Sequence, residues 1–321
     1  MFAKITGTGS YLPKKSLTNH DLAEFVDTSD EWVKQRVGIK SRHIASDDET
    51  TSLMALEAAK DAIKSANISA KDIGLVIVAT GTSEYLMPSV ASILQHELSI
   101  PSCPAFDIGA ACSGFVYAVD IAKQYIENNT AKHVLVVASE RMSRALDWND
   151  RSTCVLFGDG AGAVILSQSH EPGIIASKLH TNGEGLEMLQ FKSPLKRKLD
   201  ETHSENAYIT MQGNKVFKQA VSSLTTLVNE LLEDAKITKK DIDWLVPHQA
   251  NYRILEATAK KLGLCMSQVV VTLDTQGNTS AASIPLALDY AIKNKMITSG
   301  QTILTEAFGA GLVWGGFIAK F

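Results

Sequence analysis

The chain has 321 residues, of which 45% are hydrophobic and 21% are charged, and its net charge at pH 7 is −4. This composition is typical of a soluble globular protein with one large domain or two fused ones, and the weakly acidic balance argues against general nucleic-acid binding. No apolar run reaches the roughly 18 residues of a membrane-spanning helix. We therefore expect a cytoplasmic protein that binds neither nucleic acids nor membranes.

The cysteines form no CxxC pair and have no spacing typical of metal ligands. The N-terminal segment "MFAKITGTGSYLP" predicts a strand and a turn rather than a secretion signal. We therefore expect reduced thiols in a cytosol, with no disulfide scaffold and no metal site. The four thiols are those of Cys103, Cys112, Cys154 and Cys265.

Helical and strand patterns alternate along the chain. Residues 53–66 and 220–235 have the periodicity of amphipathic helices. Residues 73–80, 133–139 and 161–167 are short apolar runs rich in valine and isoleucine, which is typical of buried strands. The alternation predicts an α/β protein. A charged segment, 192–206, predicts a surface loop to which we assign no function.

The two halves of the chain resemble each other at a constant offset of 169 residues, as shown by "ISAKDIGLVIV" from Ile68 and "ITKKDIDWLVP" from Ile237. The same offset relates the identical pairs Ala118 and Ala287, Asp120 and Asp289, Ala122 and Ala291, Leu135 and Leu304, and Ala138 and Ala307. We interpret this repeat as a duplicated α/β unit, with one half at residues 1–171 and the other at 172–321.

Cys112 lies in "GAACSG", directly before a predicted amphipathic helix. A helix N-terminus favours a thiolate, and small neighbours allow a sharp turn and close approach of a substrate carbonyl. The Cys112 N–H is then a candidate oxyanion donor. The alternative is a buried cysteine that only packs as a small apolar residue.

Two further polar residues occupy similar junctions between strand and helix. His248 follows the strand "DWLVP", and Asn278 lies in the turn "DTQGNTSAAS". Ligands of open α/β sheets bind outside the carboxyl ends of strands, so a duplicated fold would bring Cys112, His248 and Asn278 together. Taken singly, the histidine is more often structural, and the asparagine more often serves turn geometry.

In these residues the sequence closely resembles the β-ketoacyl-acyl-carrier-protein synthase III family. The resemblance runs the whole length, through "GTGSYLP", "DTSDEWVKQRVGI", "AFDIGAACSGF", "FGDGAGA", "WLVPHQAN", "GNTSAAS" and "EAFGAG". It implies the thiolase-like fold, in which two duplicated halves form five αβαβα layers, and a homodimer.

The resemblance also implies a two-step acyl transfer. Cys112 would take the acyl group of an acyl-CoA, with acetyl-CoA as the expected primer. Malonyl on acyl carrier protein (ACP) would then lose CO₂ while His248 and Asn278 hydrogen-bond its thioester oxygen. The enolate would attack acyl-Cys112 to give 3-oxoacyl-ACP, with the backbone N–H groups of Cys112 and Ala310 as oxyanion hole. No metal or redox cofactor is implied.

The family pattern assigns three further groups of residues. The CoA-binding positions are Thr28, Trp32, Arg36, Arg151, Gly213 and Asn251, with Trp32 and Arg151 expected to sandwich the adenine. The acyl pocket is assigned to Leu86, Met87 and Phe157. The basic residues expected to bind ACP are Lys218, Arg253, Lys260 and Lys261.

The chain departs from the family pattern at two positions. Ala310 stands where members commonly have a third glycine, which would be strained if that position needs a positive φ. Met87 stands at the pocket-gating position that often holds phenylalanine, so we expect the pocket to accept primers longer than acetyl.

Other reaction classes fit less well. A papain-like hydrolase would have CGSCW-type context, a thiolase would need a second cysteine near 308–321, and a hydroxymethylglutaryl-CoA synthase would need a catalytic glutamate near Glu84. Two readings stay open: a condensing enzyme of secondary metabolism that uses longer or unusual primers, and an acyl-binding protein without activity.

Overall fold

The structure is a computed structural model that describes residues 1–192 and 208–321, so the predicted loop at 192–206 lies outside the described residues except for Lys192. Two sheets form its framework, and the four strands of the second correspond in order to four of the five strands of the first.

The first sheet has the order β1-β7-β6-β4-β5. Its strand β4 is parallel to β5 and β6, whereas β7 is antiparallel to β6 and β1. Helices α3, α4 and α5 belong to the same half of the chain. The bounds are β1 Phe2–Tyr11, α3 Thr51–Ser65, β4 Leu75–Ala79, α4 Val90–Glu97, β5 Ala105–Ile108, α5 Gly114–Glu127, β6 His133–Arg141 and β7 Asp159–Ser169.

The second sheet has the order β11-β12-β13-β8, in which β11 is parallel to β12 and the other pairs are antiparallel. The bounds are β8 Ile174–Thr181, α7 Gly213–Ala235, β11 Trp244–Pro247, α8 Tyr252–Leu262, α9 Leu273–Gln276, α10 Ser283–Lys293, β12 Thr302–Gly309 and β13 Val313–Lys320.

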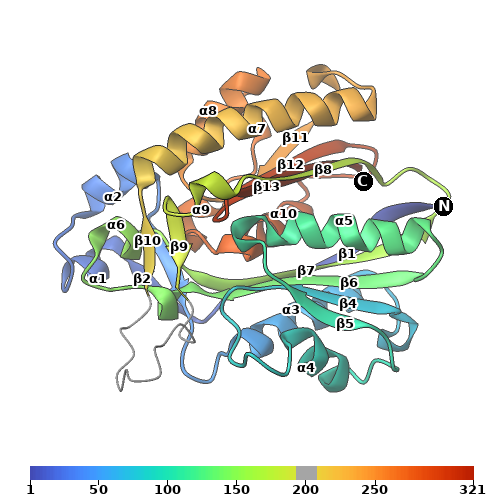
Figure 1. Ribbon diagram of the computed structural model, residues 1–321. Coiled ribbons are helices and arrows are strands. Elements are labelled where there is room, and N and C mark those ends of the chain that lie inside the picture. Colours follow the sequence, from blue (N-terminus) through green and yellow to red (C-terminus); the bar gives the residue numbers. More distant parts are fainter. Residues whose placement is uncertain (193–207) are drawn as a thin grey trace.

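Five layers result from packing these sheets against helices. Figure 1 shows α3 and α4 below the first sheet, α5 and α10 between the two sheets, and α7 and α8 above the second sheet. Each interface is a separate apolar cluster: Phe115 and Phe317 belong to the central one, Met54 to the one under α3, and Leu231 to the one under α7. The predicted thiolase-like, duplicated α/β fold is confirmed.

The 169-residue offset recurs in the local structure. The short 3-10 turns η2 (Ala111–Ser113) and η7 (Ser280–Ala282) begin 169 residues apart, as do β6 and β12. Ala111 (φ 44°) and Ser280 (φ 51°) share the left-handed conformation at the start of these turns. The boundary at residue 171/172 falls between β7 and β8 and stays a prediction.

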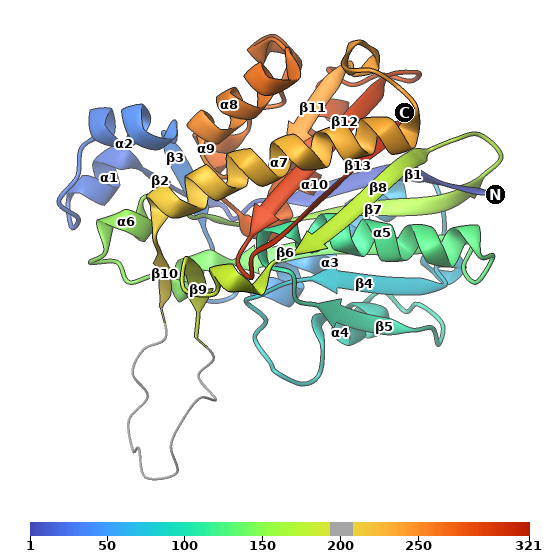
Figure 2. The same cartoon turned by 45° about the horizontal axis from the view of Figure 1, so that its top comes forward.

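Smaller elements gather at one end of the layers, where Figure 2 shows α1, α2 and α6 beside the start of α7. Their apolar cluster includes Leu22, Val33 and Leu273. These elements border the pocket described below. Their bounds are β2 Lys15–Thr18, α1 Asn19–Ala23, α2 Asp30–Val37, β3 Ser41–Ile44, α6 Arg151–Cys154, β9 Leu189–Phe191 and β10 Ile209–Met211.

Candidate active site

One pocket of about 540 Å³ contains most of the predicted site residues. Its buried end holds Cys112, His248 and Asn278, each less than a tenth exposed. Its open end lies between α2, α6 and the first turns of α7 and α8. The residues that line it and that the sequence assigned to the site are Trp32, Arg36, Cys112, Arg151, Phe157, Gly213, His248, Asn251, Arg253 and Asn278.

Cys112 sits in η2, directly before α5, as the small-residue pattern predicted. Gly309 at the end of β12 packs so closely that a Cβ there would lie 2.8 Å from the Cys112 nitrogen. Burial raises the pKa of the Cys112 thiol to about 11, with a hydrogen bond from Ser280 opposing the shift and the Glu140 charge adding to it. Desolvation is thus the largest effect on this thiol and acts against the thiolate that a helix N-terminus favours, and the role of Cys112 as nucleophile stays a prediction.

His248 follows β11, and its backbone N–H donates to the Glu306 carbonyl over 2.8 Å. Its Nδ1 lies 2.7 Å from Ser283 Oγ, which also accepts the Gln249 N–H. Nδ1 is the acceptor that the structure places beside the Ser283 hydroxyl, so we assign the hydroxyl as donor to Nδ1 and the imidazole proton to Nε2. Burial lowers the pKa of His248 to about 4, so the ring is a neutral N–H donor at the pocket.

Asn278 is held by backbone on both sides. Its N–H donates to the Leu156 carbonyl and its carbonyl accepts the Gly158 N–H. Its Oδ1 accepts the Ser280 N–H over 2.9 Å, which leaves the Nδ2 amide as a donor for the pocket that Asn278 lines. His248 and Asn278 thus both offer N–H donors and no charge, a combination suited to an oxyanion.

At the open end, the Arg151 guanidinium lies over the Trp32 ring, 4.8 Å from its centroid, and the Arg36 guanidinium lies at 5.8 Å. An adenine between Trp32 and Arg151 would need about twice the usual stacking distance between these two groups. At 4.8 Å they are too close to admit one, so the Arg151 side chain occupies the place predicted for the adenine. Arg151 is also held by the Asp27 carbonyl. Adenine binding would require this side chain to swing away from Trp32.

Three of the residues predicted for the CoA site and the acyl pocket lie outside the pocket lining. Thr28 is not among the lining residues, and its hydroxyl is buried without a partner. Leu86 and Met87 are 68% and 86% exposed and do not line the pocket. The prediction that they form an acyl pocket is therefore not met within one chain, because the loop after β4 points them to the surface.

The four basic residues assigned to ACP binding, Lys218, Arg253, Lys260 and Lys261, are all exposed. Arg253 lines the open end of the pocket and bonds the Gln35 carbonyl. Lys215, on the first turn of α7, is exposed beside Lys218 and was missed by sequence reasoning.

Ala310 does not have a positive φ, so alanine causes no strain there. It directly follows Gly309, which packs against the Cys112 nitrogen. The departure from the family's glycine therefore leaves the backbone at this position intact.

Sequence reasoning missed two buried acids near the site. Glu140, in β6, is 1% exposed, and burial raises its pKa to about 7. Glu306, in β12, is 1% exposed, and burial raises its pKa to about 8. The available signal was an acidic residue inside an otherwise apolar strand pattern.

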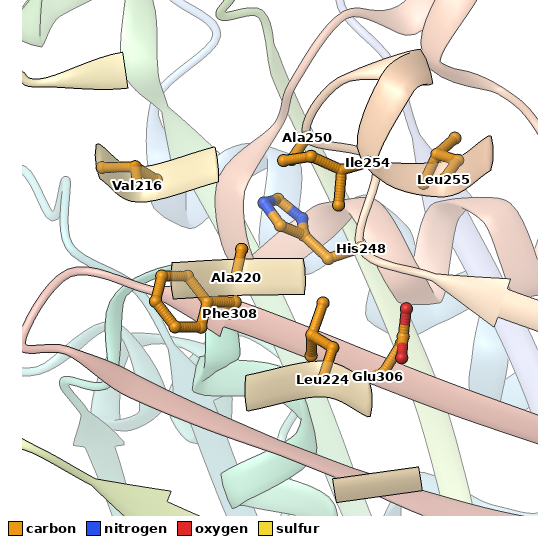
Figure 3. Close-up of a pocket in the computed structure, with 9 residues that line it drawn as sticks. All are labelled: Val216, Ala220, Leu224, His248, Ala250, Ile254, Leu255, Glu306 and Phe308. Carbon is orange, nitrogen blue, oxygen red and sulfur yellow. The ribbon is translucent and has the colours of Figure 1, made fainter. Parts of the chain in front are cut away.

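Glu306 reaches a small chamber of about 40 Å³ that adjoins His248 (Figure 3). Apolar side chains of α7 and α8 face it, and Glu306 and Phe308 enter from β12. The Glu306 Oε2 and Thr258 Oγ1 atoms are both buried without a partner. A carboxyl group in such surroundings stays neutral until well above its ordinary pKa.

Competing catalytic groups are not at this site. Glu84 accepts hydrogen bonds from Ser52 and does not line the pocket. Cys103, Cys154 and Cys265 are free and also lie outside the lining. Among the described residues, no helix is long and apolar enough to cross a membrane, and no three His, Cys, Asp or Glu side chains are grouped as metal ligands.

Comparison with known proteins decides the family. Models of 3-oxoacyl-acyl-carrier-protein synthase III match residues 106–183, and its C-terminal model matches residues 232–321. The β-ketoacyl-acyl-carrier-protein synthases III of Methylococcus capsulatus and Aliivibrio fischeri are 51% and 52% identical over 100% of this chain and 99% and 100% of their own. The chain belongs to the β-ketoacyl-acyl-carrier-protein synthase III family. The predicted family, and with it the prediction of an acyltransferase of the condensing class, is confirmed.

Solved structures agree with this family assignment. The synthase III of Aquifex aeolicus is 46% identical, with a TM-score of 0.93 over 99% of this chain and 100% of its own. A priming β-ketosynthase of the R1128 polyketide pathway is 36% identical, with a TM-score of 0.96 over 100% of this chain and 96% of its own. Within the family fold, the roles of the individual residues stay predictions.

Proposed function

We propose that the chain condenses an acyl-CoA primer, with acetyl-CoA as the expected one, with malonyl-ACP. The products would be 3-oxoacyl-ACP, CoA and CO₂, and the reaction would initiate fatty-acid synthesis. The observation that carries this proposal is a pocket that has Cys112, His248 and Asn278 at its buried end and Trp32 and Arg151 at its open end.

The first half-reaction loads Cys112. The acyl thioester carbonyl would meet the Cys112 sulfur, while the backbone N–H groups of Cys112 and Ala310 hold the developing oxyanion. The close packing of Gly309 on the Cys112 nitrogen supports this pairing. One such donor is typically worth roughly 3–4 kcal/mol of the barrier.

The second half-reaction forms the new carbon–carbon bond. Nε2–H of His248 and Nδ2–H of Asn278 would hold the malonyl thioester oxygen as CO₂ leaves and the enolate forms. A neutral histidine suits this role, because it donates a hydrogen bond to the enolate oxygen and keeps its proton. The enolate carbon then attacks the acyl-Cys112 carbonyl.

The ACP would dock beside the open end. Arg253 lies at the pocket, and Lys260 lies on the same face of α8, seven residues further on. Lys218 and Lys215 belong to the adjoining start of α7. Among the described residues, no carboxylate pairs with these four cations, which leaves their charge for an acidic carrier.

A second candidate is priming of another acyl-chain pathway with a longer primer. The 36% identity to a polyketide priming ketosynthase and the slender Met87 favour it. The two candidates share the chemistry at Cys112 and differ in the acyl group that is loaded.

The test is the intact mass of the protein after incubation with acetyl-, butyryl- and octanoyl-CoA. We expect one acyl adduct, absent in Cys112→Ala and retained in the matched control Cys265→Ala, which removes the exposed thiol. Preference for acetyl-CoA would support initiation of fatty-acid synthesis, and preference for octanoyl-CoA the second candidate. An adduct that survives in Cys112→Ala would refute the assignment of the nucleophile.

A further inference from the structure

A buried cation lies close to the pocket without lining it. Arg42, in β3, is completely buried, and Figure 2 shows this strand next to α1 and α2. Burial lowers the pKa of the guanidinium to about 10, so the group still carries its charge at neutral pH. A charge without water is costly unless several oxygens surround it, so the partners of Arg42 are informative.

The guanidinium hydrogen-bonds three oxygens from three different segments. Its Nη1 donates to the Leu17 carbonyl in β2 over 3.1 Å. Its Nη2 donates to the Val155 carbonyl directly after α6 over 2.8 Å and to Asn19 Oδ1 in α1 over 2.9 Å. All three acceptors are uncharged, so the fork shape of the guanidinium, rather than an ion pair, joins these segments.

Asn19 extends this connection to α2. Its side chain is also completely buried. Its Nδ2 donates to Asp30 Oδ1 over 3.0 Å and to the Ile39 carbonyl over 2.8 Å. Asp30 is the first residue of α2, and Ile39 lies two residues beyond its last. The hydrogen bonds thus run from α6 through Arg42 and Asn19 to both ends of α2, and we call this connection the Arg42–Asn19 bridge.

The two helices that the bridge joins carry the open end of the pocket. Trp32 lies in the first turn of α2, and Arg151 is the first residue of α6. The Arg151 guanidinium lies 4.8 Å from the Trp32 ring centroid. A connection that holds both helices therefore also sets the separation of the backbones from which these two side chains meet.

We propose that Arg42 and Asn19 are positioning residues for the CoA end of the pocket. They hold the backbones of α2 and α6 at a fixed separation, so that an adenine enters by a swing of the Arg151 side chain and not by separation of the helices. The proposal rests on the proposed function, since it takes CoA to bind between these helices. Stability alone is a weak reason for such a group, because apolar residues of similar size often replace buried charges without loss.

The experiment measures KM and kcat for acetyl-CoA and for acetyl-pantetheine, which lacks the adenine. Arg42→Met removes the fork but keeps the Cβ, to which a Cβ on Gly158 or Gly277 would come within 3.1 or 2.9 Å. We expect KM for acetyl-CoA to rise on the order of tenfold, because both stacking partners are displaced. Acetyl-pantetheine KM and both kcat values should change less than about twofold, since the buried end of the pocket is kept.

Asn19→Ala is the second variant, in case Arg42→Met does not fold. It cuts the bridge at α2 and leaves the bonds of Arg42 to Leu17 and Val155 in place. The same selective rise in KM for acetyl-CoA is expected. An equal rise for both acyl donors, or no rise in either variant, would overturn the positioning role.

Two further substitutions separate positioning from charge and from general loss of stability. Arg42→Lys keeps the charge, but one ammonium group cannot span the three acceptors, so KM for acetyl-CoA should stay raised by at least about threefold. Return to the unmodified value would show that the charge matters and not the bridge. Thr8→Val is the matched control, because it removes a buried 2.8 Å bond to Asp289 away from the pocket, and both KM values should stay unchanged.

A double variant tests whether the bridge acts through the stack. If it does, Asn19→Ala should raise KM for acetyl-CoA less in an Arg151→Ala protein than in the unmodified one, since the contact that it positions is already gone. Rises that simply multiply would show that the two positions are independent, and the proposal would fail.

Hydrogen exchange gives a readout that needs no CoA. Peptides of residues 30–37 should exchange on the order of 3–10-fold faster in both bridge variants, and peptides of 151–158 in Arg42→Met, because only Arg42 bonds Val155. Helix α3 should be unchanged. Unchanged exchange in α2 would overturn the bridge even if acetyl-CoA is a substrate. If the unmodified protein takes no acetyl group from acetyl-CoA, the proposed function fails, and exchange alone then decides whether the bridge holds the two helices.

Discussion

At the residue scale, the bond with Ser283 decides which ring nitrogen of His248 carries the proton. Ser283 Oγ lies 2.7 Å from Nδ1 and accepts the Gln249 N–H, and we assign its own hydrogen to the bond with the imidazole. His248 lines the pocket, where this Nε2–H would meet a thioester oxygen. We therefore predict that Ser283 is a positioning residue for the condensation step.

Replacing Ser283 by alanine should affect the two half-reactions unequally. Without the hydroxyl, the ring loses its preferred tautomer and orientation, so malonyl decarboxylation should fall on the order of 10–100-fold. Acylation of Cys112 by acyl-CoA should change less than threefold, because His248 has no part in it. Release of ¹⁴CO₂ from labelled malonyl-ACP and burst acylation, measured on the same preparation, would reveal equal losses if this assignment is wrong.

The residue scale also shows what sequence reasoning reaches. Small residues, strand ends and turn residues in the sequence predicted that Cys112, His248 and Asn278 lie at junctions between strand and helix. The contacts of Ser283, Ser280 and Glu140 could not be predicted, because they join residues far apart in the chain, separated by 35 positions for His248 and Ser283 and by 140 for Glu140 and Ser280. The burial of the Cys112 thiol, which raises its pKa, could not be predicted for the same reason, since burial is set by the whole fold.

At the element scale, α2 and α6 meet at the Trp32–Arg151 stack, which covers the place predicted for an adenine. Arg151→Ala should remove both the covering side chain and its stacking contact. Because cation–π contacts of this kind are worth about 1 kcal/mol, we expect KM for acetyl-CoA to rise about fivefold with little change in kcat. Acetyl-pantetheine, which lacks the adenine, is the matched substrate, and an equal rise in its KM would contradict the stacking role.

Strand β12 carries a buried acid whose ionisation opposes folding. The pKa of Glu306 is raised from 4.5 to about 8, so between these values the folded chain keeps a proton that the unfolded chain releases. The free energy of unfolding therefore falls as pH rises through this window, by up to about 1.4 kcal/mol per pH unit, and the fall ends above the folded pKa.

Glu306→Gln removes this proton linkage. Denaturant unfolding at pH 5.5 and 8 should show a smaller fall in stability for the variant than for the unmodified protein, whatever the cost of the amide at either pH. Glu140 contributes a fall of the same sign to both proteins and cancels in the comparison. Glu256→Gln, at an exposed position on α8, is the control, and equal falls in all three proteins would contradict the buried, neutral state of Glu306.

At the scale of the whole molecule, the duplication of the fold was the feature best predicted from the sequence. The offset of 169 residues appears in the starts of β6 and β12 and of η2 and η7. The repeat can be seen in the sequence because equivalent positions in the two halves must meet the same packing constraints. The repeat gives no information on surface positions such as Leu86 and Met87, which were predicted to line the acyl pocket and are exposed on the single chain.

That surface has the features of an interface between two copies. Tyr85, Leu86 and Met87 are 57%, 68% and 86% exposed, and β5 is an edge strand of the first sheet. An open edge beside exposed apolar side chains favours pairing with another chain. We therefore expect a homodimer in solution, in which the loop of each copy reaches the pocket of the other.

Two substitutions test this arrangement. Leu86→Glu should place a charge in the apolar interface and shift sedimentation from dimer to monomer, with acylation of Cys112 falling in parallel. Met87→Phe should leave the dimer intact and narrow the pocket, so that octanoyl-CoA loads at least tenfold less well relative to acetyl-CoA. A dimer unaffected by Leu86→Glu, or an unchanged primer ratio in Met87→Phe, would show that the loop does not reach a partner's pocket, and the acyl pocket would then be formed by one chain alone.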